Sequence, residues 1–354
     1  MSAKTKRPKP APRSTKPAAR KAKPAPQRKV KPSPKLKVTS SKSTAPVPAK
    51  AALVAVLPKV THLQFTANSQ ALLLARQSTK TLTLYDLETR AETPPLKALP
   101  TFSTIAMSAD SRYIAMGTST GIVAVDSAQS GKTLWKTKAA DTGGNEIEEL
   151  AFSLDASLLF AATAGDNAWL RIYNAAKGDL ATGFDTIQGA TCRHLALSND
   201  GLFLAHAEIR SNSVLVWHLP SRQVAHCIRL PIPNGPIVGL AFGATVRQLH
   251  IAQKKHLSTW NGETGQLVLD FEIPPAQSLA VLLEGNILAT TQSASEENPK
   301  QFLHMHSAPT GRLRRSIALP PKLALSRLIA SPNTLLLALP SDKHTYLWRA
   351  EKLL

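Results

Sequence analysis

From about residue 52 onward, short apolar runs alternate with polar turn segments along the whole chain. One pattern recurs seven times, an apolar–x–apolar triplet that directly precedes a polar turn. The copies are Leu63-Gln64-Phe65, Ile105-Ala106-Met107, Leu150-Ala151-Phe152, Leu195-Ala196-Leu197, Leu240-Ala241-Phe242, Val281-Leu282-Leu283 and Leu328-Ile329-Ala330. Successive copies start 42, 45, 45, 45, 41 and 47 residues apart. A period this regular predicts a repeat architecture in which each repeat is one supersecondary unit.

Each repeat continues in the same way after its first strand. A polar turn follows, clearest in Ser108-Ala109-Asp110-Ser111, Ser153-Leu154-Asp155-Ala156 and Ser198-Asn199-Asp200-Gly201. Ser, Asp, Asn and Gly bond their own backbone or tolerate unusual φ, so these segments predict tight hairpins. A second apolar run then ends at alanine: Ala75, Ala115, Ala161, Ala205, Ala252, Ala289 and Ala338.

A third strand ends on a large residue followed by a polar one: Tyr85-Asp86, Val125-Asp126, Tyr173-Asn174, Trp217-His218, Trp260-Asn261, His306-Ser307 and Trp348-Arg349. A fourth strand follows, as in residues 223–230 and 267–273. Four short strands at a period of about 44 residues are typical of a β-propeller blade. We therefore predict an all-β fold, a seven-bladed β-propeller of four-stranded antiparallel blades.

At these repeats the chain resembles the WD40-repeat family over residues 52–354, most closely in Phe152-Ser153-Leu154-Asp155 and Leu347-Trp348. It lacks the Gly-His dipeptide before each repeat and has no Trp-Asp dipeptide. The family's hydrogen-bond network from His through Ser/Thr and Asp to Trp is therefore not expected, and apolar packing must stabilise the blades. The resemblance implies a non-catalytic scaffold that binds proteins or peptides on the loop faces around the central channel.

The two ends of the repeat region predict how the ring closes. The last repeat supplies three strands before Leu354, and an unassigned apolar strand, residues 53–57, precedes the first repeat. We expect this N-terminal strand to complete the final blade. Closure of this kind removes exposed strand edges that would otherwise invite aggregation.

Charge divides the chain into a tail, residues 1–50, and a body, residues 51–354. The tail holds 16 of the 43 Lys and Arg residues, 10 of the 26 prolines and no acidic residue, so most of the net charge of +20 lies there. Such a segment cannot bury enough apolar surface to offset its ordering entropy, and we expect it to be disordered.

The tail is predicted to contact DNA, RNA or another polyanion without reading sequence, because each Lys or Arg that neutralises a phosphate releases a counterion. The candidate residues are Lys4, Lys6, Arg7, Lys9, Arg13, Lys16, Arg20, Lys21, Lys23, Arg28, Lys29, Lys31, Lys35 and Lys37. The alternative is a targeting or solubilising extension, since residues 4–9 also resemble a nuclear import signal. In the body, Arg312, Arg314 and Arg315 could extend this surface or form a solvated edge strand.

Three segments partly match catalytic or ligand-binding motifs, and none has the sequence context that its motif requires. Residues 117–121 match G-x-S-x-G but link two strands, and Ser130-Gly131-Lys132-Thr133 lacks the first glycine and the helix of a phosphate loop. Cys192 and Cys227 fall on the innermost and outermost strands of one blade, about 14 Å apart, too far for shared zinc. We read both as buried or half-buried thiols.

The remaining candidate residues have structural explanations. His304 and His306 alternate along one strand and share a face, which we expect to be solvated rather than metal-binding. Trp169, Trp217, Trp260 and Trp348 are expected to pack in or between blades. We accordingly assign no catalytic residue, metal or cofactor; the alternative is a catalytic, ligand or metal site in the central channel.

Composition also predicts where the protein is located and whether it contacts a membrane. No apolar run reaches the 18 residues of a membrane span, and two cysteines fit a reducing compartment. We expect an intracellular protein, nuclear in a eukaryote and cytoplasmic or nucleoid-associated in a bacterium, without membrane contact. The propeller is expected to be a monomer within a larger complex. A second alternative is a protein-only adaptor whose tail serves only in targeting.

Overall fold

A computed structural model divides the chain into two units, Met1–Lys37 and Val38–Leu354. The structure describes residues 52–99, 101–138, 146–163, 170–181, 192–208, 210–295, 299–320, 323–325 and 327–354. All of these belong to the second unit. The expectations for the tail, including its disorder and its fourteen candidate contact residues, therefore concern residues outside the described part of the chain.

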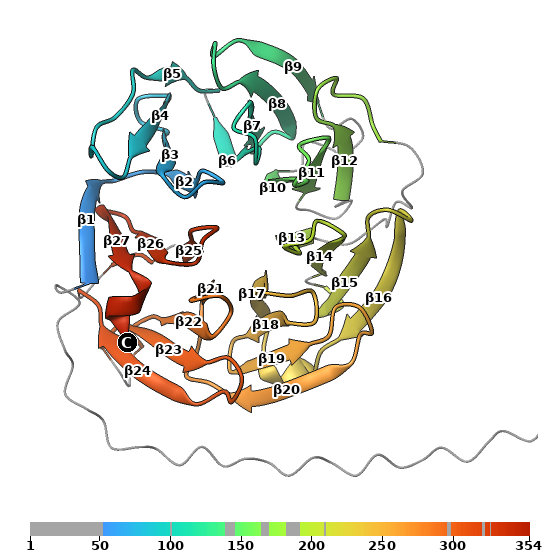
Figure 1. Cartoon of the computed structure of the whole chain (residues 1–354), viewed down its shortest axis with the longest axis vertical. Coiled ribbons are helices and arrows are strands. Elements are labelled where there is room, and N and C mark those ends of the chain that lie inside the picture. The colour runs from blue at the N-terminus through green and yellow to red at the C-terminus, as the bar shows by residue number, and fades with distance from the viewer. Residues whose placement is uncertain are drawn as a thin grey trace, which may run out of the picture. The chain divides into compact units, whose positions relative to one another are not determined.

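Within the described residues, the strands form seven antiparallel sheets, the blades, arranged around a ring (Figure 1). Blade 1 contains β2 (His62–Phe65), β3 (Ala71–Arg76), β4 (Thr81–Asp86) and β5 (Leu96–Lys97), and blade 2 contains β6 (Phe102–Met107), β7 (Tyr113–Thr118), β8 (Ile122–Ser127) and β9 (Thr133–Lys138). Blade 3 contains β10 (Ile147–Phe152), β11 (Leu158–Thr163) and β12 (Leu170–Asn174), and blade 4 contains β13 (Cys192–Leu197), β14 (Phe203–Glu208), β15 (Ser213–His218) and β16 (Gln223–Arg229).

The other three blades follow the same plan. Blade 5 contains β17 (Ile237–Phe242), β18 (Leu249–Gln253), β19 (His256–Trp260) and β20 (Leu267–Glu272), and blade 6 contains β21 (Ser278–Leu282), β22 (Ile287–Gln292), β23 (Phe302–Ser307) and β24 (Leu313–Ala318). Blade 7 contains β25 (Ile329–Ala330), β26 (Leu336–Pro340), β27 (His344–Arg349) and β1 (Leu53–Pro58). The chain also forms two short 3₁₀ turns, η2 (Ile232–Asn234) and η3 (Ala350–Leu353).

The predicted seven-bladed propeller is confirmed, and the seven repeated triplets lie on the innermost strands. Six blades have four strands and blade 3 has three among the described residues. In blade 3 an isolated bridge between Tyr173 and Leu180 marks the position of the outer strand. Successive side chains of a strand point to opposite faces of its blade, and each face packs against a neighbouring blade. Each interface between blades is therefore a section of the core.

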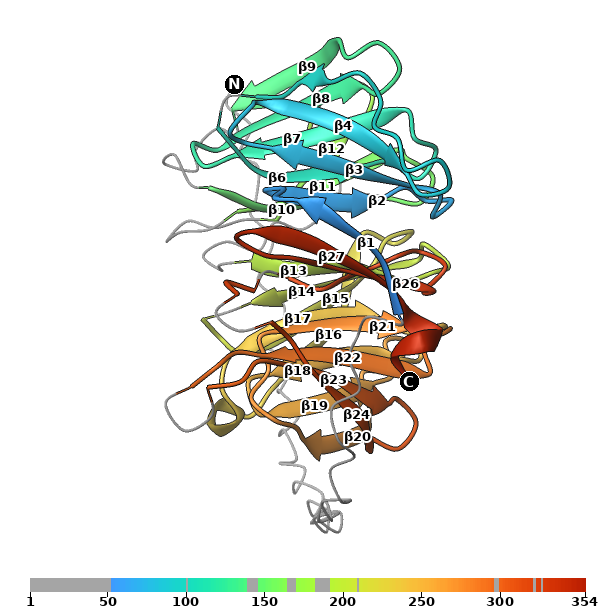
Figure 2. The same cartoon turned by 90° about the vertical axis from the view of Figure 1, so that its left-hand side faces the viewer.

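The predicted closure by the N-terminal strand is also confirmed. β1 pairs antiparallel with β27, with Val56 opposite Tyr346 and Leu57 opposite Thr345 (Figures 1 and 2). Leu57 is buried in a cluster that also contains Leu72 of blade 1 and Leu347 of blade 7. Strand β1 thus completes the last blade and helps to fill the interface between the last blade and the first.

The polar turns after the inner strands are built as their sequence predicts. The Ser108 hydroxyl donates to Asp110 Oδ1 at 2.6 Å and accepts the Tyr113 N–H at 3.0 Å. Ser198 and Asp200 form the same arrangement in blade 4, where Gly201 has a positive φ of 72°. These bonds satisfy backbone groups locally and hold each hairpin without a partner from another blade.

The tryptophans confirm the packing prediction where they are described. Trp217 is 1% exposed and lies in a cluster with Phe160 of blade 3, and Trp348 is 2% exposed and lies in a cluster with Met305 of blade 6. Trp260 is half-buried against the interface of blades 4 and 5. Trp169 lies outside the described residues.

The expectation that His304 and His306 face solvent is wrong. They share a face, as their alternation predicts, but they are 5% and 1% exposed. The reason is that β23 lies between β22 and β24 and its face packs against blade 5, where the ring of Phe271 lies 6.1 Å from that of His306. His304 is held by Gln292 Oε1 and Ser316 Oγ, each at 2.8 Å.

Buried histidines recur in neighbouring blades. The pKa values of His206, His250, His304 and His306 are lowered to about 4, mainly by burial and, for His304, in smaller part by the proximity of His306. A histidine in the unfolded chain has a pKa of about 6.5. Between these values the unfolded chain binds protons that the folded chain does not, so stability falls as the pH falls from about 6.5 towards 4.

We predict that His206→Leu reduces this acid sensitivity. The substitution removes one buried group whose protonation favours the unfolded chain, so the urea midpoint should drop less between pH 7 and pH 4.5 than it does for the wild type. Urea unfolding followed by tryptophan fluorescence at both pH values measures this difference. The control is His344→Leu, at an exposed position of β27. Equal drops for wild type and His206→Leu would contradict the prediction.

We predict that Leu57→Ala destabilises the protein by about 2–4 kcal/mol, because it removes buried methyl groups and leaves a cavity in the closing interface. The matched control is Val56→Ala on the same strand, where the side chain is 46% exposed. That change should cost less than about 0.5 kcal/mol. Chemical denaturation of both variants provides the measurement, and equal losses would argue against a closing role for β1.

Candidate functional site at the ring axis

A bulge interrupts each of four successive inner strands, at the second residue of β6, β10 and β17 and at the third residue of β13. The register shifts in β6, β10, β13 and β17 leave Ser103, Glu148, His194 and Val238 without a paired residue. Bulges redirect side chains and bend the strand locally. His194 adopts a positive φ of 57° at its bulge. Three of the four bulged residues, Ser103, Glu148 and His194, carry polar side chains near the beginning of an inner strand.

Side chains of the inner strands bond to the backbone of the next blade. Gln64 Oε1 accepts the Met107 N–H at 2.7 Å, Ser103 Oγ donates to Ile147 O at 2.7 Å, Glu149 Oε2 accepts the Leu195 N–H at 3.0 Å, and Ser278 Oγ accepts the Leu328 N–H at 2.7 Å. These bonds join blades 1 and 2, 2 and 3, 3 and 4, and 6 and 7.

One ion pair crosses the ring. The Arg327 guanidinium, directly before β25, donates to Glu149 Oε1 on β10. Blades 7 and 3 lie on opposite sides of the ring centre (Figure 1). Glu149 therefore bonds a neighbouring blade through one oxygen and a distant blade through the other. Its side chain is 17% exposed and that of Arg327 is 43% exposed.

A second ion pair and a histidine complete this ring-axis cluster, which we define as Glu148, Glu149, Arg193, His194 and Arg327. Arg193 Nη2 lies 2.7 Å from Glu148 Oε1. Withdrawal from water lowers the pKa of His194 to about 4, and the positive charge of Arg327 adds to this effect. His194 is therefore neutral at pH 7, and the charges of the two glutamates and two arginines cancel.

The cluster is suited to recognition more than to proton transfer. Each carboxylate already accepts a guanidinium, whereas the side chains of Arg193 and Arg327 remain 49% and 43% exposed. A guanidinium has five N–H donors, so both arginines can still bond carboxylates or backbone carbonyls of a bound segment. Among the described residues, no group of three or more His, Cys, Asp or Glu side chains is arranged to hold a metal ion.

The predicted basic patch lies away from this cluster, on the outer strand of blade 6. Arg312 and Arg314 are exposed, and Arg315 is half-buried and donates to Leu353 O at 3.1 Å. Arg314 lines a cleft of about 590 Å³ beside Leu354. β24 is the edge strand of blade 6, so Arg312 and Arg314 face solvent beside it, whereas Arg315 is bonded to the C-terminal 3₁₀ turn.

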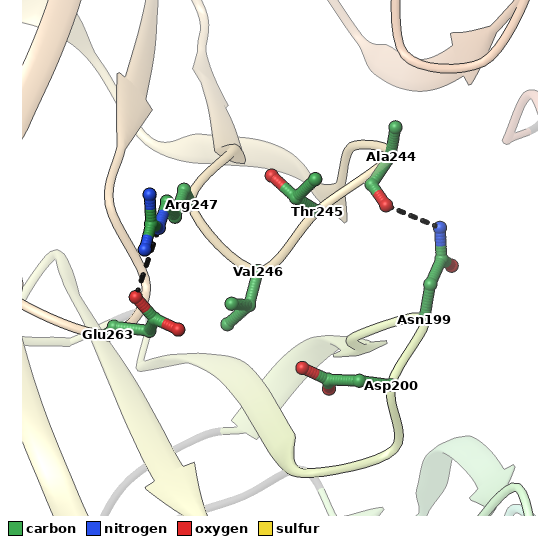
Figure 3. A pocket seen from close by; sticks show the side chains of 7 residues that line it. All are labelled: Asn199, Asp200, Ala244, Thr245, Val246, Arg247 and Glu263. Atoms are coloured by element: carbon green, nitrogen blue, oxygen red, sulfur yellow. Dashed lines mark hydrogen bonds and ion pairs between the residues drawn. The ribbon is translucent and has the colours of Figure 1, made fainter.

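A second cleft, of about 370 Å³, lies between blades 4 and 5 (Figure 3). Asn199 Nδ2 donates to Gly243 O at 3.1 Å and so bonds the two blades across it. Arg247 Nε and Glu263 Oε2 form an exposed ion pair at 3.2 Å on the other side. Because these groups are solvated and satisfied by one another, the cleft offers weak chemistry for a specific ligand.

The structure agrees with the reading of residues 117–121 as a hairpin and of the two cysteines as too far apart to share a metal ion. Residues 117–121 connect β7 to β8, and the Thr118 hydroxyl accepts the Ile122 N–H at 2.9 Å within this hairpin. Cys192 and Cys227 lie on the inner and outer strands of blade 4 as predicted. Burial raises the pKa of Cys192 to about 12. Cys227 is exposed, which corrects the expectation that it is buried or half-buried, because its side chain points outward from an edge strand.

The sequence patterns considered above do not predict the ring-axis cluster. Glu148, Glu149 and Arg193 interrupt otherwise apolar inner strands, and charged residues at such positions are the feature of the sequence that could have indicated a site. Arg327, the partner of Glu149, is 178 residues away from it in sequence. Only the circular arrangement of the blades brings the two together.

Comparison with known proteins supports the fold alone. No family model and no curated protein matches the chain. Among the solved structures that match, the β-propeller domain of Cps50 (Swd1) from Myceliophteria thermophila has a TM-score of 0.65 and 15% sequence identity, and the match covers 84% of this chain and 99% of that chain. The fold is thus a WD40-like seven-bladed β-propeller. None of the helices in the described residues is long and apolar enough to cross a membrane.

We predict that Glu149→Ala lowers the free energy of unfolding by about 1–3 kcal/mol, because it leaves the Leu195 N–H and Arg327 without their acceptor. Glu263→Ala, in the exposed Arg247 pair, is the matched control and should change stability by less than about 0.5 kcal/mol. Urea unfolding of both variants measures this difference. Urea unfolding of Arg327→Ala, which removes the ion pair and keeps the bond from the Leu195 N–H, separates the two contributions. Equal stability of the Glu149 and Glu263 variants would show that the pair is not structural.

Proposed function

We propose that the chain is a non-catalytic interaction scaffold with two parts, a polycationic tail at residues 1–50 and a propeller at residues 51–354. The propeller binds proteins or peptides on its loop faces, and the tail contacts DNA or RNA without reading sequence. We further propose that the propeller acts as a monomer within an intracellular complex and has no resident metal or cofactor.

The ring-axis cluster is the observation that carries the propeller half of this proposal. Acid–base catalysis needs a group of suitable pKa with a free position next to the reacting atom. Here Glu148 and Glu149 are occupied by guanidiniums, and His194 has its pKa lowered to about 4. The donors that remain available belong to Arg193 and Arg327, which favours recognition of carboxylates and carbonyls on a partner.

Composition carries the tail half of the proposal. Sixteen Lys and Arg residues without an acidic residue favour counterion release from a polyanion, and the absence of aromatic residues from the tail excludes base stacking. Arg312, Arg314 and Arg315 can add to this contact from the edge of blade 6. Their separate environments favour an accessory role.

We predict that the full chain binds a DNA or RNA oligonucleotide with an affinity that falls steeply with salt, and that residues 51–354 alone bind far more weakly. Filter binding between 50 and 200 mM salt measures this, because log affinity should fall linearly with log salt concentration. Substituting Lys4, Lys6, Arg7 and Lys9 with Gln should lower the slope. Equal binding by the shortened chain would rule out the tail as the nucleic-acid contact.

Affinity capture with and without residues 1–50, each with and without nuclease, separates the two halves. Partners that remain after both treatments bind the propeller. Partners lost with nuclease are held through nucleic acid, and partners lost only with the tail indicate an acidic protein or an import receptor. Stoichiometric metal in the purified protein would instead favour a metal site in the ring.

A further inference from the structure

The loop between β16 and β17 presents an apolar tip, Pro231-Ile232-Pro233, which we call the knob. Ile232 is 79% exposed, the highest value among the exposed large apolar residues of the described chain. Both flanking prolines are also exposed. Because the loop leads into the start of inner strand β17, the knob lies on the same face as the ring-axis cluster.

The knob is held in one conformation by its backbone. Residues Ile232–Asn234 form a 3₁₀ turn, and the Gly235 N–H donates to Ile232 O at 3.0 Å. Proline fixes φ on both sides of Ile232. Gly235 has a φ of 85°, and a Cβ at this position would lie 2.8 Å from Lys254 Cβ. Glycine is therefore needed for the turn to approach the β18–β19 hairpin.

Two buried amides fix the base of the knob. Gln253 is 2% exposed, and its Nε2 donates to Pro231 O at 2.9 Å and to Gly235 O at 2.8 Å. Asn212, 8% exposed, donates to Pro231 O at 3.3 Å. A buried amide is costly unless it is bonded, so these side chains commit the loop to this shape. Such preorganisation lowers the entropy lost when a partner binds.

Two exposed lysines border the knob on one side. Lys254 and Lys255 are exposed, and their backbone N–H groups bond Pro236 O at 3.1 Å and Asn234 O at 3.2 Å. Two acidic residues lie near the loop. Glu272 precedes Ile273, whose N–H bonds Lys255 O at 3.0 Å, and Glu208 Oε2 accepts the Ser213 hydroxyl at 3.0 Å beside Asn212. Two cations therefore border the apolar tip on the side of the β18–β19 hairpin, and the Glu208 carboxylate on the other side is already bonded by serine hydroxyls.

We propose that the knob anchors a protein partner that offers an apolar pocket bordered by acidic side chains; this inference rests on the scaffold function proposed above. A rigid, exposed apolar side chain flanked by charge is the arrangement of an interface hot spot with a polar rim. One isoleucine is too small to insert stably into a membrane surface, and the tip has no aromatic ring to stack on a base.

Site-specific photo-cross-linking tests the knob in the full chain. A benzophenone amino acid replaces Ile232 in one version and Val268 in the other, since Val268 is a 63% exposed apolar residue on outer strand β20. Both are expressed in the cells that produce the protein, and adducts are identified by mass spectrometry. We expect an adduct from position 232, and not from position 268, to a partner segment that contains apolar and acidic residues.

Affinity measurements with the cross-linked partner complete the test. Ile232→Asp should weaken binding by about tenfold to a hundredfold, as expected for the loss of one buried aliphatic anchor. Lys254→Glu/Lys255→Glu should also weaken binding, and added salt should weaken wild-type binding. Val268→Asp, the matched control, should leave the affinity unchanged. Ile232 is so exposed that its substitution should not disturb folding, which the urea midpoint verifies.

The knob proposal is overturned by equal adducts at positions 232 and 268, by an adduct to a basic segment or to a second copy of this chain, or by wild-type affinity in Ile232→Asp. If lysine cross-linking over the whole surface still captures a partner in that case, the scaffold function stands and only its anchor is wrong. If no partner is captured by either method, the scaffold function itself fails.

Discussion

The pairing of β1 with β27 is the constraint on which the remaining structure depends. Each blade buries its two faces against its neighbours, so a gap at one interface would expose two apolar sheet faces together. Leu57 lies opposite Thr345 and packs with Leu72 and Leu347, so one strand completes blade 7 and fills the last interface. Closure therefore determines whether all seven interfaces are buried at once.

Polar contacts between blades follow from this closed geometry. In place of a His–Ser/Thr–Asp–Trp network, the turns are held locally by pairs such as Ser108 and Asp110, and the inner strands bond to the next blade. Glu149 connects three blades, since it bonds Leu195 in the adjacent blade and Arg327 across the ring. The same cluster presents half-exposed arginines at the axis, so the groups that stabilise the ring also form its candidate recognition surface.

Burial of polar residues has a different consequence in the second and third strands of the blades. His206, His304 and His306 lie between sheets, where withdrawal from water keeps them neutral. Their alternation could be predicted from sequence, but the buried character of their face could not. Both faces of a propeller strand contact other blades, whereas alternation alone suggests one buried and one solvated face.

The sequence by itself determined the repeat period, the number of blades, the Ser-x-Asp turns and the closing role of residues 53–57, because apolar alternation and turn chemistry are local properties. It also located most of the charge in residues 1–50. The tertiary structure alone decided that Glu149 meets Arg327, that His304 and His306 are buried, and that Gln253 holds the knob around Ile232. These contacts join residues far apart in sequence or depend on which side chains a neighbouring blade covers, and both are properties of the closed ring.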